Sequence, residues 1–327
     1  MIRQSEPFRR VVLLAGGVGG ARMAEGLALA LPPHALPVIA NVGDDETFYG
    51  LHVSPDVDTL TYTLADRIDR QRGWGVANDA TRALGVLAEC GAPSWMTLGD
   101  KDFGLHIWRS WRLSQGATLT EITEDVGARF AARARVLPVT NDRLRTRLKT
   151  PLGWLDFQTW FVRERCAPEV SAITYDGAAQ AALTSEVCDA LDAADAIIIA
   201  PSNPILSIAP MLAIPGLRDR LANATAPCIA ISPLIGGKPV KGPLGKLIDE
   251  MGLPQGTELI TQSYAGLIDG VVIDTADRAD AETAACTGLD TLSTDILIPN
   301  PQSARDLASR VLQWLASRSA GQLREVS

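Results

Sequence analysis

The chain has 327 residues, of which 46% are hydrophobic and 21% are charged, and its formal net charge is −8. This composition is ordinary for a globular protein with a sizeable core, and the absence of any basic block argues against a nucleic-acid-binding surface. No apolar run approaches the ~20 residues that span a membrane, and the polar N-terminus does not resemble a signal peptide. The five cysteines are scattered without zinc-ligand spacing. We therefore expect a cytoplasmic protein.

In the first part of the chain, short apolar runs alternate with segments of helical periodicity. Strands are predicted at Val11–Ala15, Val38–Val42 and Trp95–Leu98. Helices are predicted at Ala21–Leu31, Thr59–Asp69, Asn78–Glu89, Leu105–Gln115 and Leu119–Ala132. The stretch Gly43–Asp58, rich in Asp, Gly and Pro, is predicted to be an active-site loop that ends in Asp58, a candidate helix cap.

The middle of the chain has a different pattern. Antiparallel strands are predicted at Arg145–Thr150, Gly153–Arg163 and Ser171–Tyr175, because apolar and polar residues alternate in the second of them. We expect a β-rich insertion or subdomain at about residues 133–180, within a single α/β domain that spans residues 1–327.

Alternation of strands and helices then resumes. Strands are predicted at Ala196–Ala200, Cys228–Ser232 and Val271–Asp274, and helices at Glu186–Ala194, Pro215–Ala222, Leu244–Met251 and Ala304–Arg318. The pattern predicts an α/β fold: a Rossmann-like parallel sheet flanked by helices, with a smaller β-containing insertion.

A glycine-rich turn, Gly16-Gly17-Val18-Gly19-Gly20-Ala21-Arg22, follows the first predicted strand. Glycines allow backbone N–H groups to approach a phosphate closely, and the following helix adds its positive end. The third glycine of a dinucleotide fingerprint would fall at Arg22, and no Gly-Lys-Ser/Thr follows, so neither that motif nor a Walker loop is complete. A phosphate site is favoured over a tight turn without a ligand.

Four carboxylates follow the second predicted strand: Asp44, Asp45, Asp56 and Asp58. Magnesium commonly takes one or two carboxylates together with phosphate oxygens. Asp44 alone is typical of a turn, and Asp58 alone of a helix cap. For the set, binding of magnesium or of a substrate is favoured.

Two further segments follow apolar strands. Ser202 and Asn203 lie in the turn Ala200–Pro204, where they either bind a ligand or cap a helix. The glycine-rich stretch Gly236–Pro243 carries Lys238 and Lys241, which either meet a phosphate or are solvated surface lysines. Because carboxyl ends of parallel strands meet at one edge of a sheet, we expect these segments to line one crevice with the glycine turn.

Taken together, these motifs resemble the 2-phospho-L-lactate transferase (CofD/FbiA) family of coenzyme F-420 biosynthesis. The matching segments are Gly16–Arg22, Asn41–Asp45, Ser54–Thr59, Leu98–Asp102, Pro201–Pro204 with Ser207-Ile208, and Ser232-Pro233 through Lys241–Pro243. They extend to about residue 245, and their order and spacing make the resemblance specific.

The resemblance implies a magnesium-dependent transferase, commonly a homodimer. Its donor would be a guanosine-diphospho acid such as lactyl-2-diphospho-5′-guanosine, and its acceptor the deazaflavin Fo. The ribityl hydroxyl of Fo would attack the phosphorus next to the acid, giving coenzyme F-420-0, or its dehydro form, and GMP. The acid could be lactate, enolpyruvate or glycerate.

The same resemblance implies roles for individual residues. Gly17, Val18, Gly19 and Gly20 would bind the guanosine phosphates, and Ser202 and Asn203 the nucleotide or donor. Asp45 and Asp58 would be the metal ligands and the catalytic carboxylates. Asp58, Thr97, Lys101 and Lys241 would contact substrate, although Thr97 replaces a basic residue of many relatives and Lys101 replaces their usual arginine.

Two other functions fit part of the sequence. A related branch of the superfamily shares the glycine turn and binds nucleotide-sugars as a regulator; the Ser54–Thr59 stretch and the β insertion argue against it. A nicotinamide-dependent oxidoreductase would rest on the glycine turn alone, and the incomplete fingerprint and paired aspartates disfavour it.

Overall fold

A computed structural model describes residues 8–325 and contains a central sheet of seven parallel strands. In spatial order the strands are β14 (Asp290–Ser293), β13 (Gly270–Ile273), β10 (Cys228–Ile231), β9 (Ala196–Ile199), β1 (Val11–Ala15), β2 (Pro37–Ala40) and β5 (Arg135–Pro138). The strand order reverses between β1 and β9, which pair directly with Val11 opposite Ala196. Such a reversal opens a crevice at the carboxyl edge of an α/β sheet.

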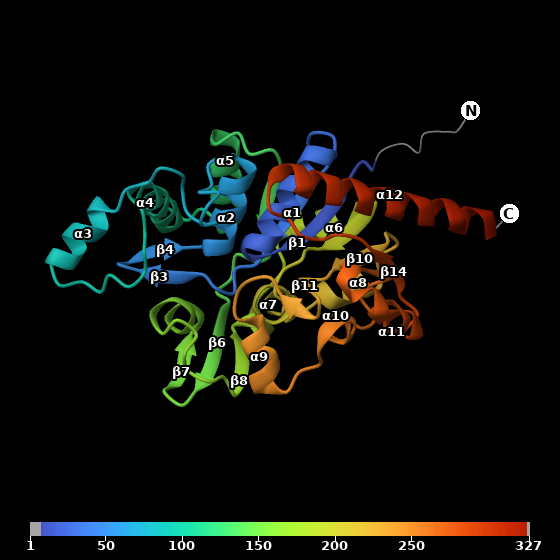
Figure 1. Cartoon of the computed structure of the whole chain (residues 1–327). Coiled ribbons are helices and arrows are strands. Elements are labelled where there is room, and N and C mark those ends of the chain that lie inside the picture. Colours follow the sequence, from blue (N-terminus) through green and yellow to red (C-terminus); the bar gives the residue numbers. More distant parts are fainter. Residues whose placement is uncertain (1–7, 326–327) are drawn as a thin grey trace.

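Helices cover both faces of this sheet. Since crossovers between parallel strands are right-handed, the connections on either side of the reversal lie on opposite faces. One layer contains α1 (Gly17–Ala30), α2 (Pro55–Leu64) and α12 (Pro301–Glu325), and Figure 1 shows α12 running alongside α1. The connections after β5, β9, β10 and β13 provide α6 (Ser185–Asp192), α7 (Ala209–Leu212), α8 (Leu217–Ala222), α9 (Leu244–Met251), α10 (Gly256–Ser263) and α11 (Ala281–Cys286).

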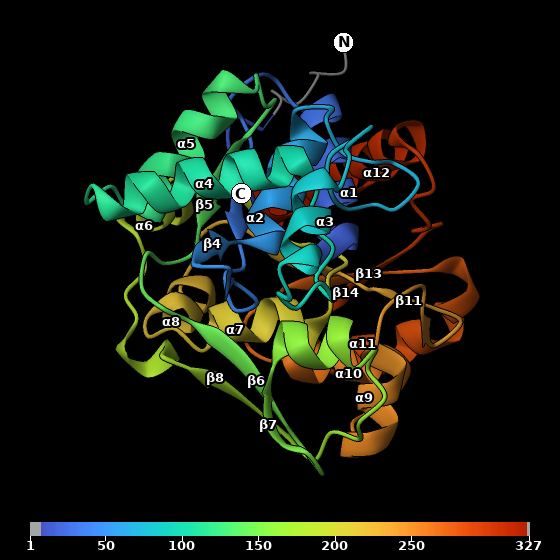
Figure 2. The ribbon, with the colours of Figure 1, turned by 90° about the vertical axis from the view of Figure 1, so that its left-hand side faces the viewer.

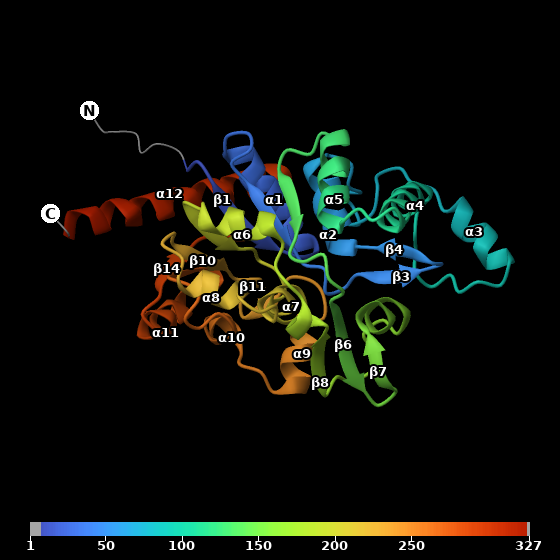
Figure 3. The same cartoon turned by 180° about the vertical axis from the view of Figure 1, so that it is seen from behind.

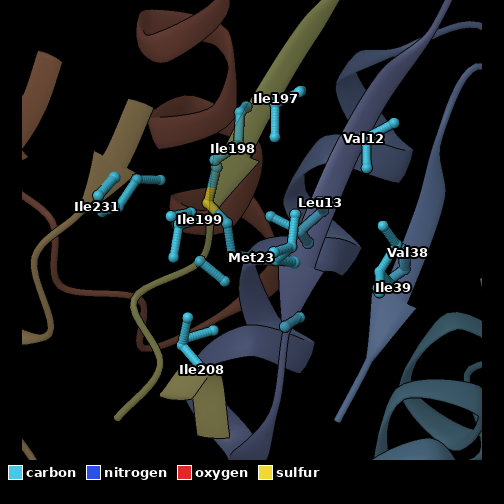
Figure 4. Packing of buried hydrophobic residues seen from close by; sticks show 14 of the residues in the cluster. Val12, Leu13, Met23, Val38, Ile39, Ile197, Ile198, Ile199, Ile208 and Ile231 are labelled. Atoms are coloured by element: carbon cyan, nitrogen blue, oxygen red, sulfur yellow. The ribbon is translucent and has the colours of Figure 1, made fainter. Parts of the chain in front are cut away.

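The central strands are apolar throughout because both of their faces are buried. In Figure 4, Leu13 of β1 and Ile198 and Ile199 of β9 lie close to Met23, which α1 places over the sheet. All four side chains are fully buried. Continuous Val/Ile/Leu runs of this kind are typical of parallel strands.

Two additions flank the crevice. The first contains the hairpin β3 (Glu46–Phe48) and β4 (Leu51–Val53) with α3 (Arg82–Glu89), α4 (Asp100–Ser114) and α5 (Leu119–Arg129); α3 projects at one end of the molecule (Figures 1 and 3). The second is an antiparallel sheet of β6 (Arg145–Thr150), β7 (Gly153–Asp156) and β8 (Ala172–Asp176), seen below α4 in Figure 2. Within the described residues, no helix is both long and apolar enough to cross a bilayer.

The predicted fold class is confirmed, and most predicted strands and helices are present with ends shifted by a few residues. The strand expected at Trp95–Leu98 is wrong: this segment packs into a side cluster, where the Trp95 ring meets Phe48 edge-on at 5.2 Å. The strand expected at Gly153–Arg163 ends at Asp156, and a π-helical turn, Thr159–Arg163, buries Trp160. The strands β5 and β14 were not predicted.

The contact between α1 and α12 gives a test of the packing. A Cβ at Gly26 would lie 2.3 Å from the carbonyl oxygen of Ala304, so Gly26→Ala must push the helices apart. We expect the free energy of unfolding to fall by about 1–3 kcal/mol. The measurement is urea unfolding followed by circular dichroism.

Gly85→Ala is the matched control, because Gly85 is also inside a helix but has open space around its Cα. It should raise stability by about 0.5–1 kcal/mol through helix propensity. Equal effects of the two substitutions would contradict the packing argument.

Candidate active site

The loops that follow β1 and β9 are joined by hydrogen bonds at the strand-order reversal. The Ser202 hydroxyl donates to the carbonyl oxygen of Gly16 (2.7 Å) and accepts from the Gly16 N–H (3.2 Å). These residues are 186 positions apart in the chain. The serine therefore fixes the position at which the glycine turn leaves the sheet.

Neighbouring atoms leave no room for a side chain at two glycines of the turn. A Cβ at Gly19 would lie 2.4 Å from the Pro201 carbonyl oxygen, and one at Gly20 would lie 2.7 Å from the Ser202 hydroxyl. Gly17 also has φ of +64°, which favours glycine. The sequence thus permits α1 to begin directly against the β9 loop.

A cavity of about 720 Å³ opens in front of this turn. Gly17, Val18 and Gly19 line it at the start of α1, and the first N–H groups of a helix have no acceptor within the helix. Arg22 and Lys241 add positive charge. Such a combination is suited to a phosphate.

Part of the cavity lining is apolar and aromatic. The Phe157 and Phe161 rings are stacked, with centroids 5.2 Å apart, and Trp74 also lines the cavity. Two π-helical turns border it, Thr159–Arg163 and Pro204–Ile208, and such turns frequently occur at functional sites. These rings offer a surface for a flat ring. The cavity therefore has places for a phosphate and for an aromatic ring, as a nucleotide or a heteroaromatic substrate requires.

Two neighbouring carboxyl groups, Asp44 and Asp56, line the cavity beside the glycine turn. Asn41 donates to both, at 2.8 Å to Asp44 and 3.0 Å to Asp56, and Asp56 also accepts from the Gly17 N–H at 2.6 Å. Burial, together with the nearby carboxylates, raises the pKa of Asp44 well above its ordinary value and that of Asp56 to about 6. The pair is a place where a proton or a cation is favoured.

Asp58 is in the opposite electrostatic state. The sequence predicted Asp58 as a helix cap, but it lies inside α2. Its carboxylate accepts two hydrogen bonds from Arg109 and one from His106 (3.3 Å to Nε2). Burial favours the neutral acid, but Arg109 and His106 outweigh it and lower the Asp58 pKa. Asp58 is therefore held ionised at the cavity wall.

Asp45 has a third environment. Asp45 immediately precedes β3, and its carboxylate accepts from the Ser54 hydroxyl at 2.6 Å and contacts Nε2 of His52 on β4 at 2.8 Å. The side chain is 2% exposed. These contacts anchor the hairpin next to the start of α2.

The structure brings most of the predicted site residues to one cavity. Those that line it are Gly17, Val18, Gly19, Asp58, Thr97, Ser202, Asn203 and Lys241. Gly20 and Asp45 are buried behind its wall. Lys101 lines a separate cavity, where its ammonium group donates to the carbonyl oxygens of Ala77 and Asn78. Asn203 additionally caps a helical turn through the N–H groups of Ile205 and Leu206.

Sequence reasoning missed His106 and Arg109. Both are buried on α4, and neither His106 Nδ1 nor Arg109 Nε has a partner within the described part of the chain. Their separation by three residues places them on one helix face, which is the only signal that the sequence offers. Nothing in it connects that face to Asp58, about 50 residues earlier.

Comparison with known proteins identifies the family. The model of a family described as 2-phospho-L-lactate transferase CofD matches residues 11–305, nearly the whole chain. This chain belongs to the CofD family. A phosphoenolpyruvate transferase of Streptomyces griseus is 36% identical over 93% of this chain and 98% of its own length. A 2-phospho-L-lactate transferase of Methanosarcina mazei is 33% identical over 93% and 99%. The CofD chain described here is therefore an enzyme of the transferase class.

A solved structure supports the CofD fold. Protein BH3568 of Bacillus halodurans superposes with a TM-score of 0.63 over 93% of this chain and 99% of its own, at 16% identity. At this identity the likeness concerns the fold alone.

The buried Asp58–Arg109 pair can be tested by Arg109→Met. Removing the guanidinium leaves an uncompensated carboxylate, so we expect a loss of about 3–5 kcal/mol of stability at pH 7. The pKa of Asp58 is lowered in the folded state, so the pair's contribution is fully present above the ordinary Asp pKa, begins to fall below that value, and is lost as pH passes through the lowered pKa. Urea unfolding should therefore show the two proteins converging below about pH 4.

Asp58→Asn/Arg109→Met should recover part of that stability, since no buried charge remains. Arg305→Met, at an exposed arginine of α12, is the control and should have little effect. A pH-independent difference between parent and Arg109→Met would contradict the electrostatic explanation.

Proposed function

We propose that this enzyme transfers a phospho-acid group from a guanosine-diphospho acid to the ribityl hydroxyl of the deazaflavin Fo, in coenzyme F-420 biosynthesis. The acid is lactate or enolpyruvate by analogy with the names of the relatives, or glycerate. The observation that carries the proposal is the cavity, which combines the first turn of α1 with an aromatic wall and buried carboxylates.

Each substrate has a suitable part of the cavity. Val18 and Gly19, in the first turn of α1, bind the diphosphate of the donor together with Lys241, since all three line the cavity. Ser202 and Asn203 support the nucleotide side, and the Phe157–Phe161 stack offers a surface for a flat ring. Thr97 and Asp58 contact the acceptor.

The reaction needs positioning more than a covalent nucleophile. The acceptor oxygen forms a bond to the phosphorus that carries the acid, the bond from that phosphorus to the GMP oxygen breaks, and a carboxylate takes the hydroxyl proton. Asp45 and Asp58 are the carboxylates proposed for catalysis. Asp58, with its lowered pKa, is better suited to orienting the hydroxyl than to keeping its proton.

Magnesium is proposed as the cofactor, because it neutralises charge on the diphosphate when bound. No set of three or more metal-binding side chains is preformed in the described residues, but magnesium commonly needs only one or two carboxylates with phosphate oxygens. Asp45 and Asp58 are the ligands implied by the family. Asp44 and Asp56 fit as additional candidates, since their raised pKa values mark a site that favours positive charge.

The deciding experiment is a turnover assay with purified protein, Mg²⁺, Fo and each guanosine-diphospho acid in turn. Release of GMP and the mass of the deazaflavin product are followed together. We expect both to appear in step, and Asp58→Asn to lower turnover about 100-fold or more because it removes the ionised group beside the acceptor.

Asp306→Asn, at an exposed aspartate of α12, is the control and should retain turnover. Mg²⁺ should also raise the melting temperature of the parent and raise it less for Asp56→Asn. Binding of a nucleotide or Fo without turnover would overturn the proposal and favour a regulatory binding protein.

A further inference from the structure

A second cavity, of about 430 Å³, lies between α2, α4 and α5, which are grouped together in Figure 2. Its buried floor is formed by Tyr62, Leu105 and Val126, and the half-buried rings of Trp108 and Phe130 form its walls. The proposed transfer reaction makes no use of it. Its volume lies within the range of small-molecule sites.

The rim of this cavity is positively charged although the chain is acidic overall. Arg67, Lys101 and Arg129 all line it. The Arg67 guanidinium lies 4.1 Å from the centre of the Phe130 ring and has no carboxylate partner among the described residues. The Arg129 guanidinium lies 5.9 Å from the centre of the Trp108 ring and donates to Asp125. This carboxylate compensates one of the three positive charges at the rim.

Arginines held over aromatic rings are preorganised to receive an anion whose body is flat. The rings fix the guanidinium groups at the edge of an apolar surface, and an anion with a planar body can use both the charge and that surface. An inorganic ion would leave the apolar floor exposed, and a neutral ring would leave Arg67 without an anionic partner.

Gly104 is the feature that keeps this cavity open. It lies in the interior of α4 on the cavity wall, where glycine weakens a helix, and a Cβ built there meets nothing within 4 Å. Any larger residue would project into the cavity. The glycine therefore has no local structural requirement but does leave room for a ligand.

We propose that this cavity is a second binding site, separate from the reaction, for a planar aromatic anion. The ring lies against Trp108 and Phe130, and the acidic group lies at the rim between Arg67 and Arg129. The site adjoins the main cavity, because Tyr62 lines both and its hydroxyl donates to Asp102 of the main cavity at 2.9 Å.

The test is calorimetric titration of the full chain with 2-naphthoate, an aromatic carboxylate that lacks any reactive group. Gly104→Leu should abolish binding at this site while leaving the melting temperature equal or higher, since leucine favours the helix. Gly85→Leu is the matched control: it makes the same change in α3, where there is also open space, and should bind like the parent.

Charge and shape are tested separately. Arg67→Ala/Arg129→Ala should weaken 2-naphthoate binding at least about tenfold, and Arg305→Ala should not. Neutral 2-naphthamide and acetate should each bind at least about tenfold more weakly than 2-naphthoate. Binding that survives Gly104→Leu, or that is equal for 2-naphthoate and 2-naphthamide, would overturn the proposal, as would an absence of binding to the parent.

Discussion

The reversal of strand order between β1 and β9 is the constraint on which the rest of the molecule depends. It brings the loops after these strands within hydrogen-bonding distance, where one hydroxyl, that of Ser202, satisfies both the N–H and the carbonyl group of Gly16. Only glycine fits at position 19 against the facing carbonyl group of Pro201. This contact fixes the start of α1, and the Gly17 N–H at that start in turn donates to Asp56, one of the carboxylates that line the cavity.

The carboxyl groups in the cavity differ in charge state because of their hydrogen-bonding and ionic partners rather than because of how deeply they are buried. Asp56 and Asp58 are buried and Asp44 is half-buried, yet only Asp58 has an arginine and a histidine against it. Desolvation raises the pKa of all three, and Arg109 and His106 on α4 outweigh it for Asp58. A single cavity therefore presents a fixed negative charge beside a pair of groups that favour a proton or a cation.

The sequence predicts what depends on local pattern. The five most apolar strands of the central sheet, the glycine turn and the segments that follow β1, β2 and β9 were recognisable, because periodicity and the carboxyl-edge rule are enough to place them. The partners of Asp58 were not, since a candidate helix cap and a buried ion pair look alike until α4 is placed. The strand expected at Trp95–Leu98 failed for a similar reason: an apolar run can pack into a side cluster instead of a sheet. The π-helical turn at Thr159–Arg163 continues an alternating pattern, so periodicity alone could not reveal it.

The pairing of β1 with β9 also has a consequence for biosynthesis. At about 5–20 residues per second, β9 leaves the ribosome roughly 10–40 s after β1, because some 186 residues separate the loops that they position. Throughout that interval one edge of a fully apolar strand has no neighbour. This unpaired edge exposes the nascent chain to aggregation during the interval, and the glycine turn acquires its contact with Ser202 only after that residue has been made.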